Sequence, residues 1–162
     1  MRVCIDIQAA IAQRAGVGRY TKMLVEHLGP QAGEDELVLF YFDFKRKGSP
    51  FPVKNAREQT VRWIPGRWVQ QAWKRMDWPP FDAFSGPADL YHFPNFVRPP
   101  LRKGKSVVTI HDVSFLRYPE TMDTRNHAFL SSQIQQTVER SDAIITDSTF
   151  VADEIHSRLK VP

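Results

Sequence analysis

The chain has 162 residues, about the size of one domain, and its apolar fraction of 42% and charged fraction of 25% are those of an ordinary globular protein. It has one cysteine, no zinc-like Cys/His spacing, no secretory leader and no apolar run near the ~18 residues of a membrane-spanning helix, so we expect a cytoplasmic protein without disulfides or metal. The net charge of +4 permits phosphate-bearing substrates or an anionic membrane, but the basic residues are dispersed among carboxylates, and no nucleic-acid partner is expected.

The chain opens with a short apolar strand at residues 2–7, followed by a loop that carries Gly16 and Gly18 and leads into a helix. A glycine-containing loop before a helix N-terminus can hold a phosphate or another anion, and Arg19 would add positive charge. The two glycines are also compatible with a tight turn that binds nothing. Helical spacing continues from residue 17, and we expect Gly29-Pro30 to end the helix.

A β-rich run at residues 36–42 predicts the second strand, and a third is expected at 60–64, after a polar loop at 45–55. A helix is predicted at 66–76 and should end before Pro79-Pro80.

Four tryptophans lie in and around this helix at five-residue spacing: Trp63, Trp68, Trp73 and Trp78. Five residues advance a helix by ~140°, so no single face collects all four. Together with nearby arginines and lysines they could contact an anionic membrane. Packing of the helix on the sheet, with the basic side chains reaching out to water, is the simpler interpretation.

The fourth strand is expected at 88–93 and stops at Pro94. His92 lies within it and is interpreted as a structural histidine. Asn95 follows the strand, and its amide suits sugar hydroxyls, although asparagine is also common in turns that bind nothing.

The fifth strand, at 106–110, delivers His111 and Asp112 to its carboxyl end. Ligands of open α/β sheets bind outside the carboxyl ends of the strands, so we expect this pair to belong to a site. A surface histidine beside a capping aspartate is the alternative.

The last elements are a helix at 125–140, a strand at 143–146 and a closing helix for which Ser148 is the expected N-cap. Alternation of short apolar runs with amphipathic stretches is typical of an α/β domain. We therefore predict a Rossmann-like three-layer sandwich with a mostly parallel sheet.

In this order, the motifs resemble the N-terminal domain of family 4 (group 1) glycosyltransferases, and within them the mannosyltransferase-like branch. The resemblance covers essentially the whole chain and rests on these segments: 16–21, 89–95 with Pro99-Pro100, 109–115 with 118–120, and 141–148. It implies the GT-B architecture, in which an N-terminal domain mainly receives the acceptor and a C-terminal domain mainly binds the nucleotide-sugar. It also implies a retaining, metal-independent enzyme without a cofactor, whose donor substrate is a GDP- or UDP-sugar.

Residues 1–162 would then be a single acceptor-side domain, and the C-terminal donor-binding domain, with its paired glutamates, is absent from this chain. The expected activity is transfer of a hexose, mannose in this branch, to a glycan or lipid-linked acceptor in polysaccharide biosynthesis. The isolated domain is expected to be inactive without its own C-terminal domain. A peripheral contact with the inner face of the membrane stays open.

The resemblance implies roles for particular residues. His111 would position the sugar or acceptor more than it would move a proton, and Asp112 would orient an acceptor hydroxyl or act as a weak general base. Gly16, Gly18 and Arg19 would hold the donor phosphates. Three further side chains are expected to contact substrate: Tyr20, Asn95 and Ser114.

Two alternatives remain. A nicotinamide-binding domain would use Gly16 and Gly18 in its fingerprint and Asp43 on the ribose, but Thr21 replaces the third glycine and the 7–16 loop is too long. That interpretation also leaves the histidine-aspartate pair unexplained. The other alternative is a non-catalytic module that binds carbohydrate or protein.

Overall fold

The computed structural model describes residues 1–12, 16–48, 51–118, 120 and 124–159, so Pro119 of the 118–120 segment lies outside the described residues. Six strands form one all-parallel sheet in the order β3-β2-β1-β4-β5-β6. Their bounds are β1 Arg2–Asp6, β2 Glu36–Phe42, β3 Ala56–Val61, β4 Leu90–Phe93, β5 Lys105–Ile110 and β6 Ala143–Thr146. The predicted α/β class and Rossmann-like sandwich are confirmed.

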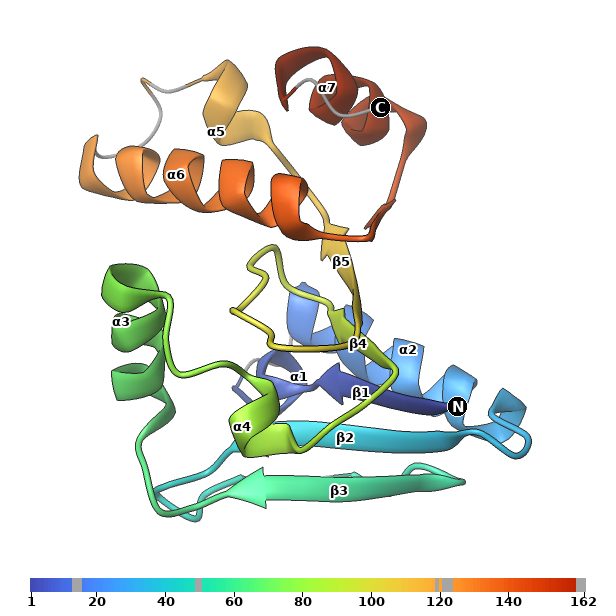
Figure 1. Cartoon of the computed structure of the whole chain (residues 1–162). Coiled ribbons are helices and arrows are strands. Elements are labelled where there is room, and N and C mark those ends of the chain that lie inside the picture. The colour runs from blue at the N-terminus through green and yellow to red at the C-terminus, as the bar shows by residue number, and fades with distance from the viewer. Residues whose placement is uncertain (13–15, 49–50, 119, 121–123, 160–162) are drawn as a thin grey trace.

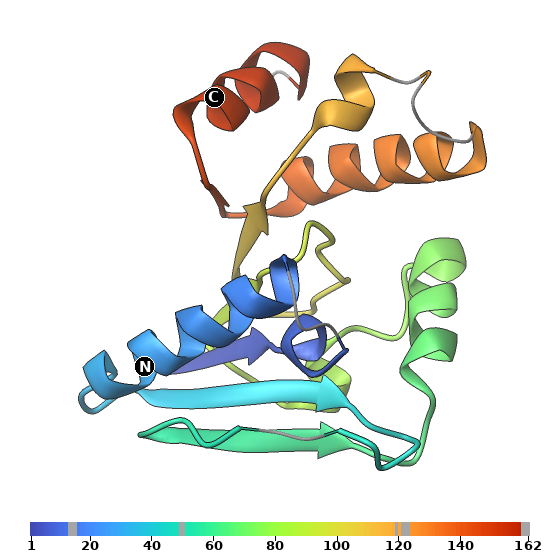
Figure 2. The ribbon, with the colours of Figure 1, turned by 180° about the vertical axis from the view of Figure 1, so that it is seen from behind.

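Helices flank both faces of this sheet (Figures 1 and 2). Their bounds are α1 Gln8–Ala12, α2 Val17–Gln31, α3 Gly66–Met76, α4 Asp82–Ser85, α5 Ser114–Arg117, α6 Thr124–Arg140 and α7 Thr149–Leu159. Helices α1 and α2 cover one face, and α3, α4 and α6 pack over the other. The short helices α1, α4 and α5 were not predicted, because four or five residues carry no periodic signal.

Strand β2 supplies the core on both faces because its side chains alternate. Leu37, Leu39 and Tyr41 pack in the cluster that contains Val25 of α2. Phe40 joins the opposite cluster, under α4 and α6. A strand buried on both faces shows the continuous apolar run that its sequence has.

The third strand begins earlier than predicted and ends at Val61, so the predicted 60–64 range is wrong in extent. The bounds of β3 are set by its neighbouring strand, β2. Strand β3 pairs with β2 from Leu37–Ala56 to Phe42–Val61, and no ladder remains beyond Phe42 to hold residues 62–64. The predicted bounds of β2, α3 and β6 are confirmed.

Helix α2 does not stop at Gly29-Pro30 as predicted but continues to Gln31. Pro30 lies in the last turn and lacks the N–H that would bond the carbonyl four residues earlier, and the helix ends one residue after it. Gly29 serves a different purpose: a Cβ here would collide with the Lys54 carbonyl and Val53. Glycine therefore admits the neighbouring segment instead of ending the helix.

Candidate functional site

The sheet reverses its strand order between β1 and β4. From β1 the chain adds β2 and β3 on one side, and from β4 it adds β5 and β6 on the other. Helices α1 and α2 follow β1 over one face of the sheet, whereas β4 is followed by a loop at residues 94–104, from which Phe96 and Leu101 pack on the other face. Connections that diverge in this way leave a crevice at the carboxyl ends of the two strands. This switch point is the place where open α/β sheets bind ligands.

A pocket of about 380 Å³ occupies this crevice. Its walls come from the end of β1, the tip of β4 and helices α1, α3 and α6. The polar side chains that line it are Asp6, Gln8, Gln70, Lys74, Asn95 and Gln133, and Trp73 adds an aromatic wall. A concave apolar site with a few convergent polar groups has the character of a small-molecule site.

Asp6, the last residue of β1, places a carboxyl group in this pocket. Its Oδ1 accepts a hydrogen bond from the Gln8 N–H at 2.9 Å. Burial raises the pKa of Asp6 to about 6, and the Gln8 N–H opposes the shift only in part. The carboxyl therefore titrates close to neutral pH, which suits a group that accepts or donates a proton in a site.

Asp6 was not among the residues predicted for the site. The available signal was a carboxylate at the end of an apolar strand, the same pattern that singled out the fifth strand. Gln8, also missed, holds the strand ends together, because its Oε1 accepts the Phe42 N–H at 2.9 Å.

Trp73 lies half-buried on the inner side of α3. Its indole Nε1–H donates to the Pro79 carbonyl, and its ring packs against Phe42 and Phe81. The indole is therefore held rigidly where it meets the pocket. A fixed aromatic surface beside amides and a carboxylate can contact the apolar face of a sugar while the polar groups bind its hydroxyls.

Asn95 is the one residue predicted for the site that lines this pocket. It follows Pro94 at the tip of β4 and is exposed. The next residue, Phe96, has φ of 62° and donates its N–H to the Thr109 carbonyl, which turns the chain at the pocket rim.

His111 lies directly behind this rim. Its Nε2–H donates to the Pro94 carbonyl at 3.0 Å, and Nδ1 contacts Asp147 Oδ2 at 2.7 Å. The Tyr20 ring packs edge-on against the imidazole with the centroids 4.6 Å apart. A carbonyl and a carboxylate both accept hydrogen bonds, so each ring nitrogen of His111 faces an acceptor within the chain.

The structure thus brings together Tyr20 and His111, two of the residues predicted for the site. It also uses both ring nitrogens of His111 within the chain, so a sugar must displace Pro94 or Asp147 to bond the ring directly. Asp147, which closes this cluster, was missed, because its contact with His111 spans 36 positions.

Asp112 turns away from His111 into a local turn. Its two carboxylate oxygens accept the N–H and the Oγ–H of Ser114, each at 2.6 Å. These bonds start α5 at Ser114. Asp112 and Ser114, both predicted for the site, meet each other, and neither lines the pocket at the switch point.

Gly16 and Gly18 stand at the N-terminus of α2. Gly16 has φ of 57°, a conformation that favours glycine, and it has no side chain with which to cap the helix. The first-turn N–H groups, with exposed Arg19 beside them, can therefore meet an anion. Tyr20, in the same turn, contacts Thr109 Oγ1 at 3.3 Å, which places this end of the helix near β5.

Two other side chains are engaged inside the fold. His92 is buried with Nε2 2.9 Å from Thr109 Oγ1, and burial lowers its pKa to about 4, so it is a neutral structural histidine. Asp43 Oδ1 accepts the N–H groups of Lys47 and Gly48 in its own turn.

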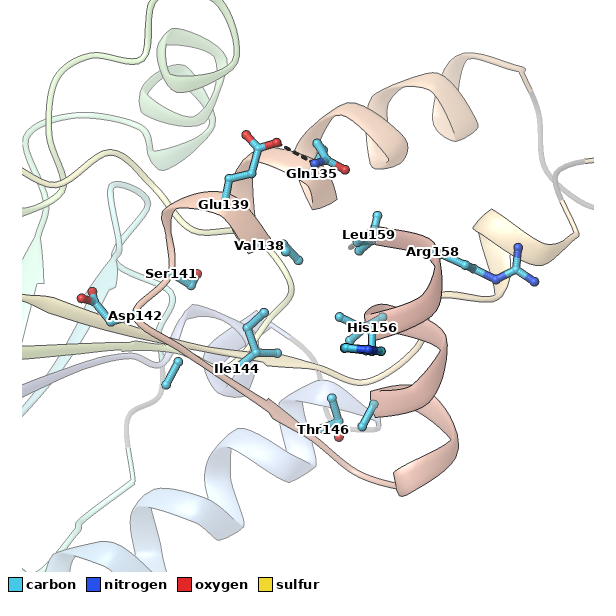
Figure 3. A pocket seen from close by; sticks show the side chains of 13 residues that line it. Gln135, Val138, Glu139, Ser141, Asp142, Ile144, Thr146, His156, Arg158 and Leu159 are labelled. Atoms are coloured by element: carbon cyan, nitrogen blue, oxygen red, sulfur yellow. Dashed lines mark hydrogen bonds between the residues drawn. The ribbon is translucent and has the colours of Figure 1, made fainter. Parts of the chain in front are cut away.

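A larger hollow, of about 900 Å³, lies elsewhere, between α6, β6 and α7 (Figure 3). It opens beside the outer edge of β6, which pairs with no strand in the described ranges. Val138, Ile144 and Leu159 give it an apolar wall. None of the residues predicted for the site lines it, and it does not lie at the switch point.

No protein-family model matches the sequence, and the search of curated proteins found no significant match. Family membership therefore stays an expectation based on the order of the motifs. Across the described ranges, no helix combines the length and apolar character needed to cross a bilayer.

Proposed function

We propose that this chain is the acceptor-side domain of a retaining glycosyltransferase. It would serve transfer of a hexose, mannose by the resemblance, from a GDP- or UDP-sugar to a glycan or lipid-linked acceptor. The observation that carries the proposal is the pocket at the switch point, where Asp6, Asn95 and Trp73 meet. Carboxylate, amide and indole are the groups that bind sugar hydroxyls and cover a sugar ring.

In a retaining transfer, the bond between the anomeric carbon and the donor diphosphate oxygen breaks. The same carbon then bonds to an acceptor hydroxyl oxygen on the face that the diphosphate leaves. The hydroxyl proton passes to the departing diphosphate oxygen, so no protein base is required. Negative charge on that diphosphate is best stabilised by fixed N–H groups and a cation, which the start of α2 and Arg19 would supply.

Within this proposal the acceptor sugar occupies the pocket, and Asp6 accepts a hydrogen bond from one of its hydroxyls. Asn95, after β4, and Gln133, on α6, bind other hydroxyls. His111 positions the rim, because its Nε2–H holds the Pro94 carbonyl.

One observation favours the nicotinamide-binding alternative: the strand order is the one found in dinucleotide-binding sheets. Two observations count against it. Helix α1 stands between β1 and Gly16, where the fingerprint turn should follow the strand directly. The Asp43 carboxylate, which would bind the ribose, already accepts two backbone N–H groups of its own turn.

Nuclear magnetic resonance titration of the ¹⁵N-labelled chain tests the proposal. We expect mannose disaccharides to shift the amides of Asp6, Asn95 and the neighbouring pocket residues, and GDP or UDP to shift those of the first turn of α2. Asp6→Asn should weaken the disaccharide response, whereas Glu34→Gln, the same chemical change at an exposed turn, should leave it intact.

Shifts caused by NADH, with none caused by sugars or nucleotides, would favour a dinucleotide-binding domain. No response to any of these ligands would favour the protein-interaction module.

A further inference from the structure

Three of the four tryptophans near α3 are exposed, which is unusual for a side chain of this size. Trp63, Trp68 and Trp78 are 71%, 61% and 63% exposed, and Met76 is 64% exposed. Trp73 packs inward, as the simpler interpretation of the sequence expected, and Trp63, although exposed, contacts the Phe84 ring with the centroids 5.9 Å apart. Exposed apolar side chains that gather in one region mark a binding surface more often than chance.

The geometry of α3 separates an inner side from an outer one. Val69 is buried and Trp73 half-buried against the sheet. At about 100° per residue, Arg67, Trp68 and Arg75 fall within roughly 100° of each other on the opposite side, and all three are exposed. The outer side of α3 therefore mixes an indole with two guanidinium groups.

The charge of this region is one-sided. From residue 62 to 78 the chain has four basic residues, Arg62, Arg67, Lys74 and Arg75, and a single acidic one, Asp77. The Asp77 carboxylate accepts a hydrogen bond from Arg140 Nη1 at 2.6 Å, so its charge is already paired. Arg62 is paired as well, with its Nε 4.0 Å from Asp43 Oδ2, and the basic charge of the outer side therefore comes from the exposed Arg67 and Arg75.

The α3 surface is defined here as the outer side of the helix, with Arg67, Trp68 and Arg75, together with the exposed apolar residues next to it along the chain, Trp63, Met76 and Trp78. We propose that the α3 surface docks on an anionic phospholipid bilayer. Indole rings prefer the level of the lipid headgroups, and cations on the same side are attracted by anionic lipid. Basic residues beside large exposed apolar ones are the pattern of a helix that lies in the membrane interface.

Helix α3 lies close to the switch-point pocket. In both views α3 stands beside the end of the sheet to which the strand arrows point (Figures 1 and 2). Gln70 and Lys74, on the flank of the same helix, line the switch-point pocket. A membrane against α3 would therefore lie next to that pocket. Docking itself rests on the α3 surface alone and does not depend on the proposed transfer activity.

Co-sedimentation with vesicles tests the docking. The wild-type chain should sediment with vesicles that contain phosphatidylglycerol and stay in solution with phosphatidylcholine alone, and added salt should weaken the binding. Trp68→Ala/Trp78→Ala and Arg67→Gln/Arg75→Gln should each lower the affinity at least about tenfold, the equivalent of two lost interfacial contacts. Matched controls are Phe44→Ala for an exposed aromatic and Lys45→Gln/Lys103→Gln for two exposed charges.

Tryptophan fluorescence of the wild-type chain provides a second measurement that needs no variant. Insertion of exposed indoles among headgroups should shift the emission to the blue with phosphatidylglycerol vesicles and leave it unchanged with phosphatidylcholine. Binding that the tryptophan variant does not weaken would overturn the proposal. So would a dimer that this variant dissociates without any vesicle binding, because it would assign the α3 surface to a second copy of the chain.

Discussion

Asp6 and His111 are titratable groups at the carboxyl ends of two strands in the same sheet, yet the fold treats them differently. Asp6 opens into the switch-point pocket, and its one described partner is a backbone N–H two residues away. His111 is held by the Pro94 carbonyl, Asp147 and the ring of Tyr20. A polar residue at a strand end is therefore available to a ligand only if residues at the neighbouring strand ends do not already occupy its hydrogen-bonding atoms.

The largest expected effect is the pH dependence due to Asp6. Its pKa is raised from 3.8 to about 6, so between about pH 4 and pH 6 the folded chain keeps a proton that the unfolded chain has released. Stability falls as the pH rises through this window. Asp6→Asn removes that loss, and the variant should gain about 2–3 kcal/mol on the wild type across the window.

Urea unfolding of the two proteins over a pH series measures this gain. The free energies of unfolding of the two proteins must be subtracted at each pH. His92, with its pKa lowered to about 4, makes stability rise with pH in both proteins, and the subtraction removes this common contribution. Parallel stability curves for wild type and Asp6→Asn would show that the Asp6 carboxyl is solvated like one on the surface.

Removal of the His111 ring should have the second-largest effect on stability. His111→Ala leaves the Pro94 carbonyl and the Asp147 carboxylate without their donor and takes away the edge contact to Tyr20. We expect a loss of about 2 kcal/mol in the free energy of unfolding at neutral pH, measured by urea titration. A variant as stable as the wild type would mean that the cluster does not brace the strand ends.

Asp112→Ala should cost less, about 0.5–1 kcal/mol, because the turn that starts α5 loses two hydrogen bonds at an exposed position. Thermal unfolding by circular dichroism gives the value. If the folded Asp112→Ala variant lost the amide shifts caused by the disaccharide, Asp112 would belong to the binding site after all.

Asn95→Ala should change stability least, within about 0.5 kcal/mol, because the side chain is exposed. Its effect should appear in binding, as an about tenfold loss of disaccharide affinity, or about 1.4 kcal/mol. Calorimetric titration checks both this loss and the matched control Asn55→Ala, in an exposed turn remote in sequence. Equal affinity in the two variants would remove Asn95 from the site.

Much of the α/β architecture was predictable because its signals are local. The apolar run of β2, the bounds of α3 and the capping of α7 by Ser148, whose Oγ accepts the Val151 N–H, follow from neighbouring residues. Errors arose where a distant segment decided the outcome. The extent of β3 depends on the length of β2, and Gly29 lies inside α2 as a position where the close Lys54 carbonyl leaves no room for a side chain.

The sequence by itself determined which strands end in polar residues, and it placed Asn95 and His111 at such ends, because side-chain alternation and turn residues act over a few positions. Only the tertiary structure decided which of these ends converge. Pairing of β1 with β4 sets Asp6 beside Asn95, and pairing of β5 with β6 brings Asp147 to His111. Strand order is a long-range property of the sheet, so the pocket and the bracing cluster are fixed by contacts that no local pattern encodes.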